Sequence, residues 1–435
     1  MRCLWMPVTV LGLFATTVST GAAQTAPAVT LSALLEASRH HHPTLAERGL
    51  LKQSLAAEKS QLDAAYYPQL AVGGSATWQS DVTQLDLPVP GVEIEPLPKD
   101  QYKLTLDLQQ TLWDFGGTAD RKRVAETRAR LRQRQVDVEW HQIRNRIVQL
   151  YFTGVVQQQL RAQAHTLDGY LATTVEKAQV ALAQGVVTER DVLLARARKL
   201  QARHALVNAE ARLQGVRRSL AELTGQALGP DAVLAAPEVH CEQRDDQRVF
   251  AQTLKRPELE VLSAQREILD AVQEAEEAAD RPRISAFATT GYGRPGLNML
   301  SRDFDFFFMG GLRIAIPLTY LYSGTHRQAR AQLAKDRAVV DKQQEALLIQ
   351  VNTELSQQQA EVQRLDATLA LDAELVALRE GARKQVEVQL ELGTATMTDL
   401  LNDLSQEDQA RSQLAIHRYQ RSLACHEIAL TLGEL

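Results

Sequence analysis

Hydrophobic residues in this chain follow two alternating patterns, a helical spacing over long stretches and a spacing of two over short ones. From Leu31 the apolar residues recur every three or four positions, which predicts a helix over residues 31–65 and a counterpart over residues 246–279. Pro68 and Pro282 follow these helices. Each proline ends its helix because proline lacks an N–H and disfavours helical geometry in the residue before it.

After each proline the spacing changes to two. Apolar side chains then alternate with small or polar ones, as expected for strands with one apolar and one polar face. The predicted strands cover residues 70–79, 102–109, 284–292 and 304–316. Strands of about ten residues with this alternation fit a transmembrane barrel with lipid outside and water inside, and a soluble sandwich is the alternative. The aromatic run from Phe304 to Phe308 favours the barrel.

Four strands are too few to close such a barrel. An open sheet edge cannot lie in lipid, and about eight strands is the smallest usual number in bacterial barrels. Several copies of the chain must therefore share one barrel, which would have eight strands with two copies and twelve strands with three.

The longest helical stretches run from Gly117 to Gly185 and from Gly324 to Gly393. At ~1.5 Å per residue, each continuous helix would extend roughly 100 Å. Steps of three and four residues between apolar positions predict coiled-coil seams on the long helix and on the helix that returns from its end. The predicted seam residues are Leu160, Ala164, Leu167, Leu171, Val175, Ala178 and Leu182, and on the returning helix Leu193, Ala197, Leu200, His204, Val207 and Ala211.

The joint after each long helix has the same motif. The octets "QGVVTERD" (residues 184–191) and "LGTATMTD" (residues 392–399) both read G-x-x-T-x-x-D. Together with the repeated order of helix, two strands and helical hairpin, they indicate two copies of one structural unit. We expect a signal peptide over residues 1–23, a first repeat over 24–224, a linker over 225–245 and a second repeat over 246–435.

Each octet predicts a tight turn between antiparallel helices. Glycine ends the first helix in left-handed geometry, threonine caps the next helix, and aspartate completes a capping box. These residues are Gly185, Thr188 and Asp191 in the first octet and Gly393, Thr396 and Asp399 in the second. The turn chemistry leaves Val186, Val187, Thr394 and Ala395 uncommitted. Small, mostly apolar residues at an exposed tip indicate a partner surface, and a turn without a partner is the alternative.

The N-terminus has the features of an export signal. Arg2 precedes a largely apolar stretch, and Gly21 and Ala23 suit a cleavage site that would leave Gln24 at the mature N-terminus. No later stretch approaches the ~18 uninterrupted apolar residues of a membrane-spanning helix. The net charge of −5 gives no indication of a nucleic-acid partner.

Catalytic and metal-binding motifs are not evident. The sequence has no glycine-rich phosphate loop after a strand and no nucleophile elbow, so we expect neither an enzyme nor a cofactor. His40, His41 and His42 are adjacent and cannot share one helix face, which favours a solvated helix end over a metal site. In the mature chain Cys241 and Cys425 either form a disulfide or remain separate thiols.

Four features together resemble the TolC-like outer-membrane efflux proteins. They are the doubled octet, "YYPQL" (residues 66–70), "LQQTLWDFGG" (residues 108–117) and the two-copy order, and the resemblance covers nearly the whole mature chain. It implies a mainly α-helical homotrimer with a 12-stranded membrane β-barrel and a tunnel of coiled-coil hairpins in the periplasm.

The resemblance also implies a function and partners. The chain would be the outer-membrane channel of a tripartite efflux or type I secretion system. Its tips, Gly185–Thr188 and Gly393–Thr396, would dock on the periplasmic adaptor of an inner-membrane pump, and lipid would surround the barrel. Drugs, metals and polypeptides all remain candidate substrates. An exported coiled-coil scaffold or adhesin without a pore is the alternative.

Acidic residues near the tips form a candidate gate. Asp191 follows the first tip, and Asp399 and Asp403 share one helix face after the second. Threefold symmetry would multiply them into rings that attract cations and raise one another's pKa values. The family commonly places its second acid three residues after the position of Asp399, where this chain has Asn402, so solvated helix charges are the alternative.

Overall fold

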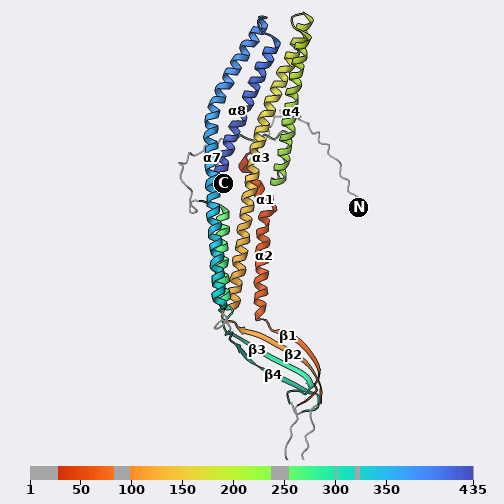
Figure 1. The fold of residues 1–435 in the computed structure, drawn as a ribbon. Coiled ribbons are helices and arrows are strands. Elements are labelled where there is room, and N and C mark those ends of the chain that lie inside the picture. Colours follow the sequence, from red (N-terminus) through yellow and green to blue (C-terminus); the bar gives the residue numbers. More distant parts are fainter. Residues whose placement is uncertain (1–27, 83–97, 237–253, 299–300, 319–323, 435) are drawn as a thin grey trace, which may run out of the picture.

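The chain forms a long helical rod with a four-stranded sheet at one end (Figure 1). The computed structural model describes residues 28–82, 98–236, 254–298, 301–318 and 324–434. The first half contains α1 (Leu31–His41), α2 (Pro43–Asp63), a short 3₁₀ helix (Ala64–Tyr66), β1 (Gln69–Trp78), β2 (Asp100–Trp113), α3 (Gly117–Ala183) and α4 (Glu189–Thr224). The second half contains α5 (Pro257–Ala278), β3 (Arg283–Arg294), β4 (Asp305–Ala315), α7 (Thr325–Glu391) and α8 (Met397–Leu432).

The first helix of each repeat is shorter than predicted. The helix expected over residues 31–65 is interrupted at His42, which adopts extended geometry because Pro43 follows it. In the second repeat α5 begins at Pro257, where the missing N–H of proline costs nothing in the first helical turn. The remainder of the expected helix, residues 246–253, lies outside the described residues. None of the helices in the described part of the chain combines the length and the apolarity needed to cross a membrane.

All four predicted strands are present, and they form one antiparallel sheet in the order β1-β2-β3-β4. The pairing of β2 with β3 joins the two repeats, so β1 and β4 are the two edges of the sheet. One row of facing residues across the sheet consists of Val72, Leu106, Thr290 and Phe308. Val72 and Phe308 are largely exposed, and so are most of the apolar residues on this face. The opposite face is polar around Asp107, which accepts hydrogen bonds from Thr105 and Thr289.

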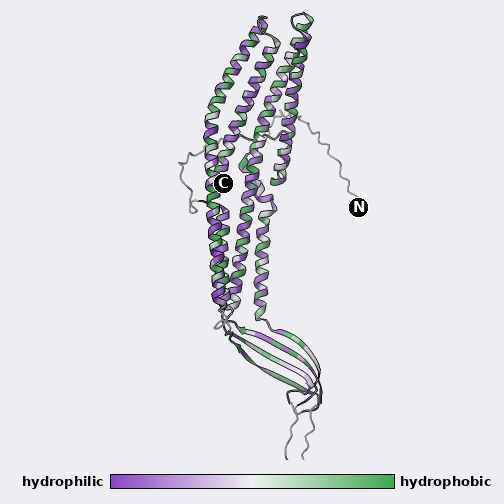
Figure 2. Ribbon diagram, in the orientation of Figure 1, coloured by the Kyte–Doolittle hydropathy of each residue, from purple (hydrophilic) through white to green (hydrophobic). Residues whose placement is uncertain are grey.

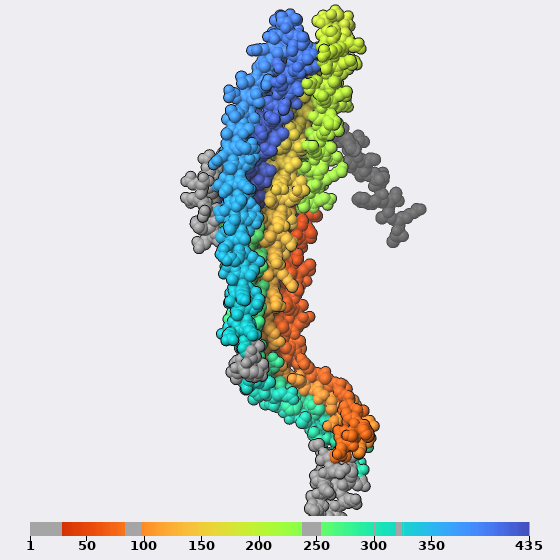
Figure 3. Space-filling model, in the orientation of Figure 1, coloured from red at the N-terminus to blue at the C-terminus, as the bar shows by residue number. Residues whose placement is uncertain are grey.

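The helices form a layer whose order differs from their order in the chain. In the half of the rod farther from the sheet, α3 packs along α4, α7 packs along α8, and α8 lies against α3. The order across the rod is therefore α7, α8, α3, α4, with α7 and α4 on its two edges (Figures 1 and 3). In the half nearer the sheet, α5 packs against α3 and α7, and α2 packs against α3.

The two long helices are continuous over 67 residues each, but only part of the predicted seam is correct. On α3, Ala164, Leu171, Val175 and Ala178 are buried as predicted. The seam predicted on α4 is wrong, because Leu193, Ala197, Leu200, His204, Val207 and Ala211 are all exposed. The face of α4 that packs on α3 contains Val192, Ala195, Ala202, Ala209, Leu213, Val216 and Leu220 instead. Both sets have heptad spacing, so periodicity could not distinguish the face that packs within the chain.

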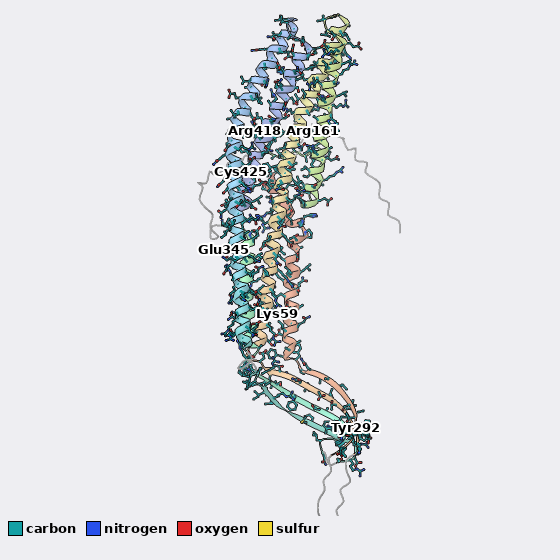
Figure 4. The ribbon with its side chains drawn as sticks, in the orientation of Figure 1. Lys59, Arg161, Tyr292, Glu345, Arg418 and Cys425 are labelled. Atoms are coloured by element: carbon teal, nitrogen blue, oxygen red, sulfur yellow. The ribbon has the colours of Figure 1, made fainter. Side chains whose placement is uncertain are left out.

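The second hairpin is closed by ion pairs as well as apolar contacts. From the tip downwards, α7 and α8 are joined by Arg383–Glu407, Glu380–Arg411, Asp372–His417 and Asp366–Arg421. Glu407 is only 7% exposed and binds both Arg383 and Arg411. Between α3 and α4, the described ion pair is Arg161–Glu210, and Arg161 is labelled in Figure 4. Alanine, valine and leucine side chains form the rest of the seam.

Heptad-spaced ion pairs also join the helices near the sheet. Between α5 and α7 they are Arg330–Glu277, Arg337–Asp270 and Arg266–Asp341, and between α3 and α5 they include Arg123–Glu274 and Arg130–Glu267. Successive pairs lie seven residues apart along each helix, except for the last α5–α7 pair. This spacing is expected for side chains that flank an antiparallel seam.

Figure 2 shows hydrophilic and hydrophobic residues interleaved along the whole rod.

The largest apolar core lies in the middle of the rod. Tyr151 and Phe152 on α3 pack there with Leu34 of α1, Leu220 of α4 and Leu234 of the segment after α4. The Tyr151 hydroxyl donates to the Val29 carbonyl at 3.0 Å, and burial raises the pKa of Tyr151 to about 12. This core attaches both the start of the described chain and the segment after α4 to the long helix.

Cys425 on α8 lies in a smaller cluster and is disulfide-bonded (Figure 4). The other cysteines of the sequence, Cys3 and Cys241, lie outside the described residues. Of the two alternatives that the sequence left open, a disulfide and separate thiols, Cys425 has the disulfide, and Cys241 is not among the described residues.

Replacing Glu407 tests the importance of the buried ion-pair cluster. Glu407→Ala removes an ionic hydrogen bond from the largely buried Arg383, which should lower the free energy of unfolding by about 2 kcal/mol. Denaturant unfolding followed by circular dichroism measures this loss. Glu345→Ala is the matched control, because the Lys342–Glu345 pair is exposed and its loss should change the free energy of unfolding much less. Equal losses in the two variants would contradict the interpretation.

Candidate functional site

The two tips at the free end of the rod have the same backbone turn. At the first, the Gly185 N–H donates to the Leu182 carbonyl and the Val186 N–H donates to the Ala181 carbonyl. At the second, Gly393 and Thr394 donate to Leu390 and Gln389 in the same way. Gly185 and Gly393 have φ values of 74° and 76°, a left-handed geometry that favours glycine. These are Schellman motifs, so each helix ends with its last carbonyls satisfied.

The returning helices begin with the predicted capping boxes. The Thr188 hydroxyl accepts from the Asp191 N–H at 3.3 Å, and the Thr188 N–H donates to the Asp191 carboxylate at 2.9 Å. Thr396 and Asp399 repeat this exchange at 3.2 and 2.9 Å. Hydrogen bonds from Thr188 and Thr396 lower the pKa values of Asp191 and Asp399 below their ordinary value. Both carboxylates are therefore ionised at neutral pH and engaged in the turn.

The side chains between the tip glycine and the capping threonine lie at the surface. Val186 is 73% exposed and Val187 is half-buried, while Thr394 is exposed and Ala395 is half-buried. The Thr394 hydroxyl donates to the Gln389 carbonyl at 3.1 Å, so this residue takes part in the turn. Leu392, which sequence reasoning overlooked, is 74% exposed and adds a large apolar side chain to the second tip. The sequence signal for this exposed side chain was an apolar residue directly before the tip glycine. With Leu392 included, both tips present an exposed apolar side chain beside the turn.

Asp399 and Asp403 lie on the first turns of α8, as predicted. Asp399 is exposed and Asp403 is half-buried. Asn402 occupies an exposed position between them. Within one chain the hydrogen bonds from Thr396 lower the pKa of Asp399. The raised pKa expected for a ring of acids would require the carboxylates of neighbouring copies.

Polar side chains connect the two hairpins below the tips, and the sequence alone gave no sign of them. The Tyr170 hydroxyl on α3 donates to the Glu387 carboxylate on α7 at 3.0 Å. Farther from the tips, the Gln163 amide on α3 donates to the carboxylate of Asp408 at 2.8 Å and to Ser412 at 3.0 Å, both on α8. Burial raises the pKa of Asp408. These bonds hold the two hairpins side by side.

The described residues contain no cluster of histidine, cysteine and acidic side chains arranged to hold a metal ion. His40 contacts Glu36 at the end of α1, and the His42 ring accepts from the Thr44 N–H at the start of α2. The His41 ring lies against Gly225 at the end of α4, where a Cβ would approach it to 2.4 Å. The three histidines thus point to different neighbours.

A family model described as outer membrane efflux protein matches residues 34–226, which contain the first helices, the first two strands and the first hairpin. No curated protein matches the chain in sequence. Solved structures match over nearly the whole chain. VceC of Vibrio cholerae is 21% identical with a TM-score of 0.64, and the match covers 93% of this chain and 96% of VceC.

Two more solved outer-membrane channels have the same fold. CmeC of Campylobacter jejuni is 14% identical with a TM-score of 0.66, over 93% of this chain and 85% of CmeC. MtrE of Neisseria gonorrhoeae, solved in its open state, is 16% identical with a TM-score of 0.66, over 93% of this chain and 88% of MtrE. Residues 34–226 thus match the outer membrane efflux protein family, and the described chain has the fold of these solved outer-membrane channels.

Proposed function

We propose that this protein is the outer-membrane channel of a tripartite efflux or type I secretion system. It would pass substrates from an inner-membrane pump across the periplasm and the outer membrane. One observation carries the proposal: a sheet with an exposed apolar face and two open edges continues directly into a rod of 67-residue helices. The sheet provides a segment of a membrane barrel, and helices of ~100 Å provide the length of a periplasmic tunnel.

The two open edges of the sheet support closure by further copies, and the family resemblance supplies the number three. Unpaired backbone groups on β1 and β4 cannot face lipid, and β4 of one copy can pair with β1 of the next in the same antiparallel pattern. Three copies would give twelve strands. The apolar face that carries Val72, Leu106 and Phe308 would meet lipid, and the face around Asp107 would line the pore.

The size and conductance of the purified protein test this function against the pore-free scaffold. We expect three copies per particle when the mass is measured in detergent, and discrete conductance steps after insertion into planar lipid bilayers. Heat-dissociated protein from the same preparation is the control for conductance by contaminants. A stable monomer, or a trimer that never conducts, would support the scaffold instead.

The tips are the proposed docking surface for the adaptor. Exposed apolar side chains are costly in water unless a partner buries them, and each copy has two tips with the same turn. A trimer would present six such tips in one ring. A small contact at each tip would then be multiplied by avidity, because the remaining contacts become intramolecular after the first one forms.

Charges at the first tip should prevent docking without affecting the channel itself. Val186→Asp with Val187→Asp leaves Gly185, Thr188 and Asp191 in place, so the turn and the trimer should persist. We expect efflux in cells to fall to the level of a strain without the channel, and cross-linking to the adaptor to be lost. Val186→Ser with Val187→Ser controls for the loss of the valines alone. If the charged variant still pairs with the adaptor and supports export, the octet is only a turn.

Asp399 and Asp403 are the proposed acids of the periplasmic constriction. Asp399→Asn keeps an acceptor for Thr396, so the double variant with Asp403→Asn removes two charges per copy with little change to the turn. We expect the preference for cations over anions in single-channel recordings to fall at least twofold. Asp336→Asn, a half-buried acid on α7 far from the tips, is the control. Unchanged selectivity in the double variant would remove these acids from the gate.

A further inference from the structure

The sheet face that carries Asp107 also holds two aromatic rings, each with a cation over it. The Nζ atom of Lys103 lies 5.9 Å from the centre of the Phe307 ring. The guanidinium carbon of Arg313 lies 5.2 Å from the centre of the Phe287 ring. Side chains alternate between the faces of a strand, and the register places all four of these side chains on the Asp107 face. Two cation–aromatic contacts therefore lie on the surface that would line the pore.

Glycines on the neighbouring strand allow both rings to lie flat along the sheet. Phe307 faces Gly291, and Phe287 faces Gly311. A Cβ atom at Gly291 would come within 2.6 Å of the Phe307 ring, and one at Gly311 within 3.2 Å of the Phe287 ring. Glycine inside a strand is typical of a place where another group approaches the backbone closely. The rings thus cover the sheet instead of projecting from it, and Phe307 is only 8% exposed.

These side chains form a continuous strip along β4, which we call the lumen strip. Its members, in order along the strand, are Lys103 over Phe307, then Met309, then the Phe287 ring over Gly311, and then Arg313. Met309 is 45% exposed in the middle of the strip. The strand rises ~20 Å between Phe307 and Arg313. The lumen strip therefore has an apolar middle and a cation at each end.

Both cations of the lumen strip are available to a ligand. Lys103 and Arg313 are exposed, and neither has a carboxylate partner among the described residues. Asp107 lies two strands away from Met309, a distance of ~10 Å across the sheet, and accepts a hydrogen bond from Thr289. A guanidinium that stacks on a ring keeps N–H groups at its edge, where they can bind a carboxylate.

The charge of the whole face favours anions. Its charged residues on β1–β4 are Lys103, Arg283 and Arg313, which are basic, and Asp107 and Asp305, which are acidic. Three positive and two negative charges leave a net charge of +1 per copy. Charged side chains that line a pore set its preference for ions of opposite sign. The sign of this face is opposite to that of the acids near the tips.

We propose that the lumen strip is a weak binding site for organic anions that carry an aromatic ring, such as aromatic carboxylates. The ring of the ligand would pack on Met309 and the two phenylalanine rings, and its carboxylate would accept hydrogen bonds from Arg313 or Lys103. Weak binding suits a passage, since a tightly held ligand would leave slowly. The inference rests on the proposed channel and deepens it, because it names a class of substrate.

Block of the single-channel current by naphthoate tests this site. In planar bilayers naphthoate should reduce the current of the native channel as its concentration rises. Acetate lacks the ring and naphthylmethanol lacks the charge, so both should have much weaker effects. Lys103→Gln with Arg313→Gln should raise the naphthoate concentration for half block about fivefold, because the charged hydrogen bonds are lost. Arg294→Gln is the matched control and should change nothing, since Arg294 stacks on Phe304 in the same way but on the opposite face.

Two further variants separate charge from aromatic packing. Lys103→Arg with Arg313→Lys keeps both charges and should keep the block by naphthoate. Phe287→Leu with Phe307→Leu keeps the apolar surface without the rings, and should weaken the block about threefold because stacking is lost. A change in the block by acetate in either variant would contradict the assignment of the ring to these phenylalanines.

The reversal potential in a salt gradient provides a second measurement without a ligand. Lys103→Gln with Arg313→Gln should shift the selectivity towards cations, opposite to the shift expected from Asp399→Asn with Asp403→Asn. The single variants are measured as well, so that the test does not depend on insertion of the double variant.

The outcomes distinguish this site from the channel itself. Variants that conduct in plain salt with unchanged block and an unchanged reversal potential would overturn the lumen strip and leave the proposed channel intact. A native channel on which naphthoate acts no more strongly than acetate would do the same. A native protein that never conducts would overturn the proposed channel.

Discussion

The backbone of an edge strand cannot be left unpaired in lipid, and this constraint governs the rest of the structure. The sheet ends at β1 and β4, each with a row of backbone groups that no other strand in the described chain satisfies. In the proposed trimer, further copies would give every strand a neighbour. The same copies would then set the positions of the helices, since α3 continues from β2 and α7 follows β4.

The helical rod is held together by polar contacts to an unusual degree. Ion pairs at heptad spacing join α5 to α3 and to α7, and most of the participating side chains are partly exposed. Each exposed pair contributes at most about 1 kcal/mol, so these ladders set the register of the helices more than they stabilise the chain. Large apolar residues such as Leu200 and Leu378 remain outside the core. A single copy thus leaves large apolar side chains exposed on its helices as well as on its sheet.

The two repeats use the same turn but different hairpin seams. Apolar residues such as Ala195, Ala202 and Leu213 close α3 on α4, whereas ion pairs around Glu407 add to the apolar contacts of α7 with α8. An apolar seam is stabilised by burial and close packing. The buried carboxylate of Glu407 depends on its arginine partners, because removal of one partner leaves a buried charge uncompensated. The two hairpins thus share the tip turn but differ in the physical properties of their seams.

The sequence by itself determined the features that depend on local chemistry and periodicity. Alternation located all four strands, and glycines located the ends of the long helices. The octets specified both capping boxes, including the exchange of hydrogen bonds between Thr188 and Asp191. The predicted first helices were wrong at Pro43 and Pro257. Each of these prolines begins a helix, whereas the prediction had one helix continue through it.

Tertiary structure decided which face of each helix is used, and by which partner. Helix α4 has two heptad stripes, and spacing could not show that Ala202 faces α3 while Leu200 faces outward. The links from Tyr170 to Glu387 and from Gln163 to Asp408 join residues more than 200 positions apart, so no local pattern encodes them. Periodicity fixes the direction of a side chain around its own helix. The neighbour that it meets depends on how the helices are arranged in space.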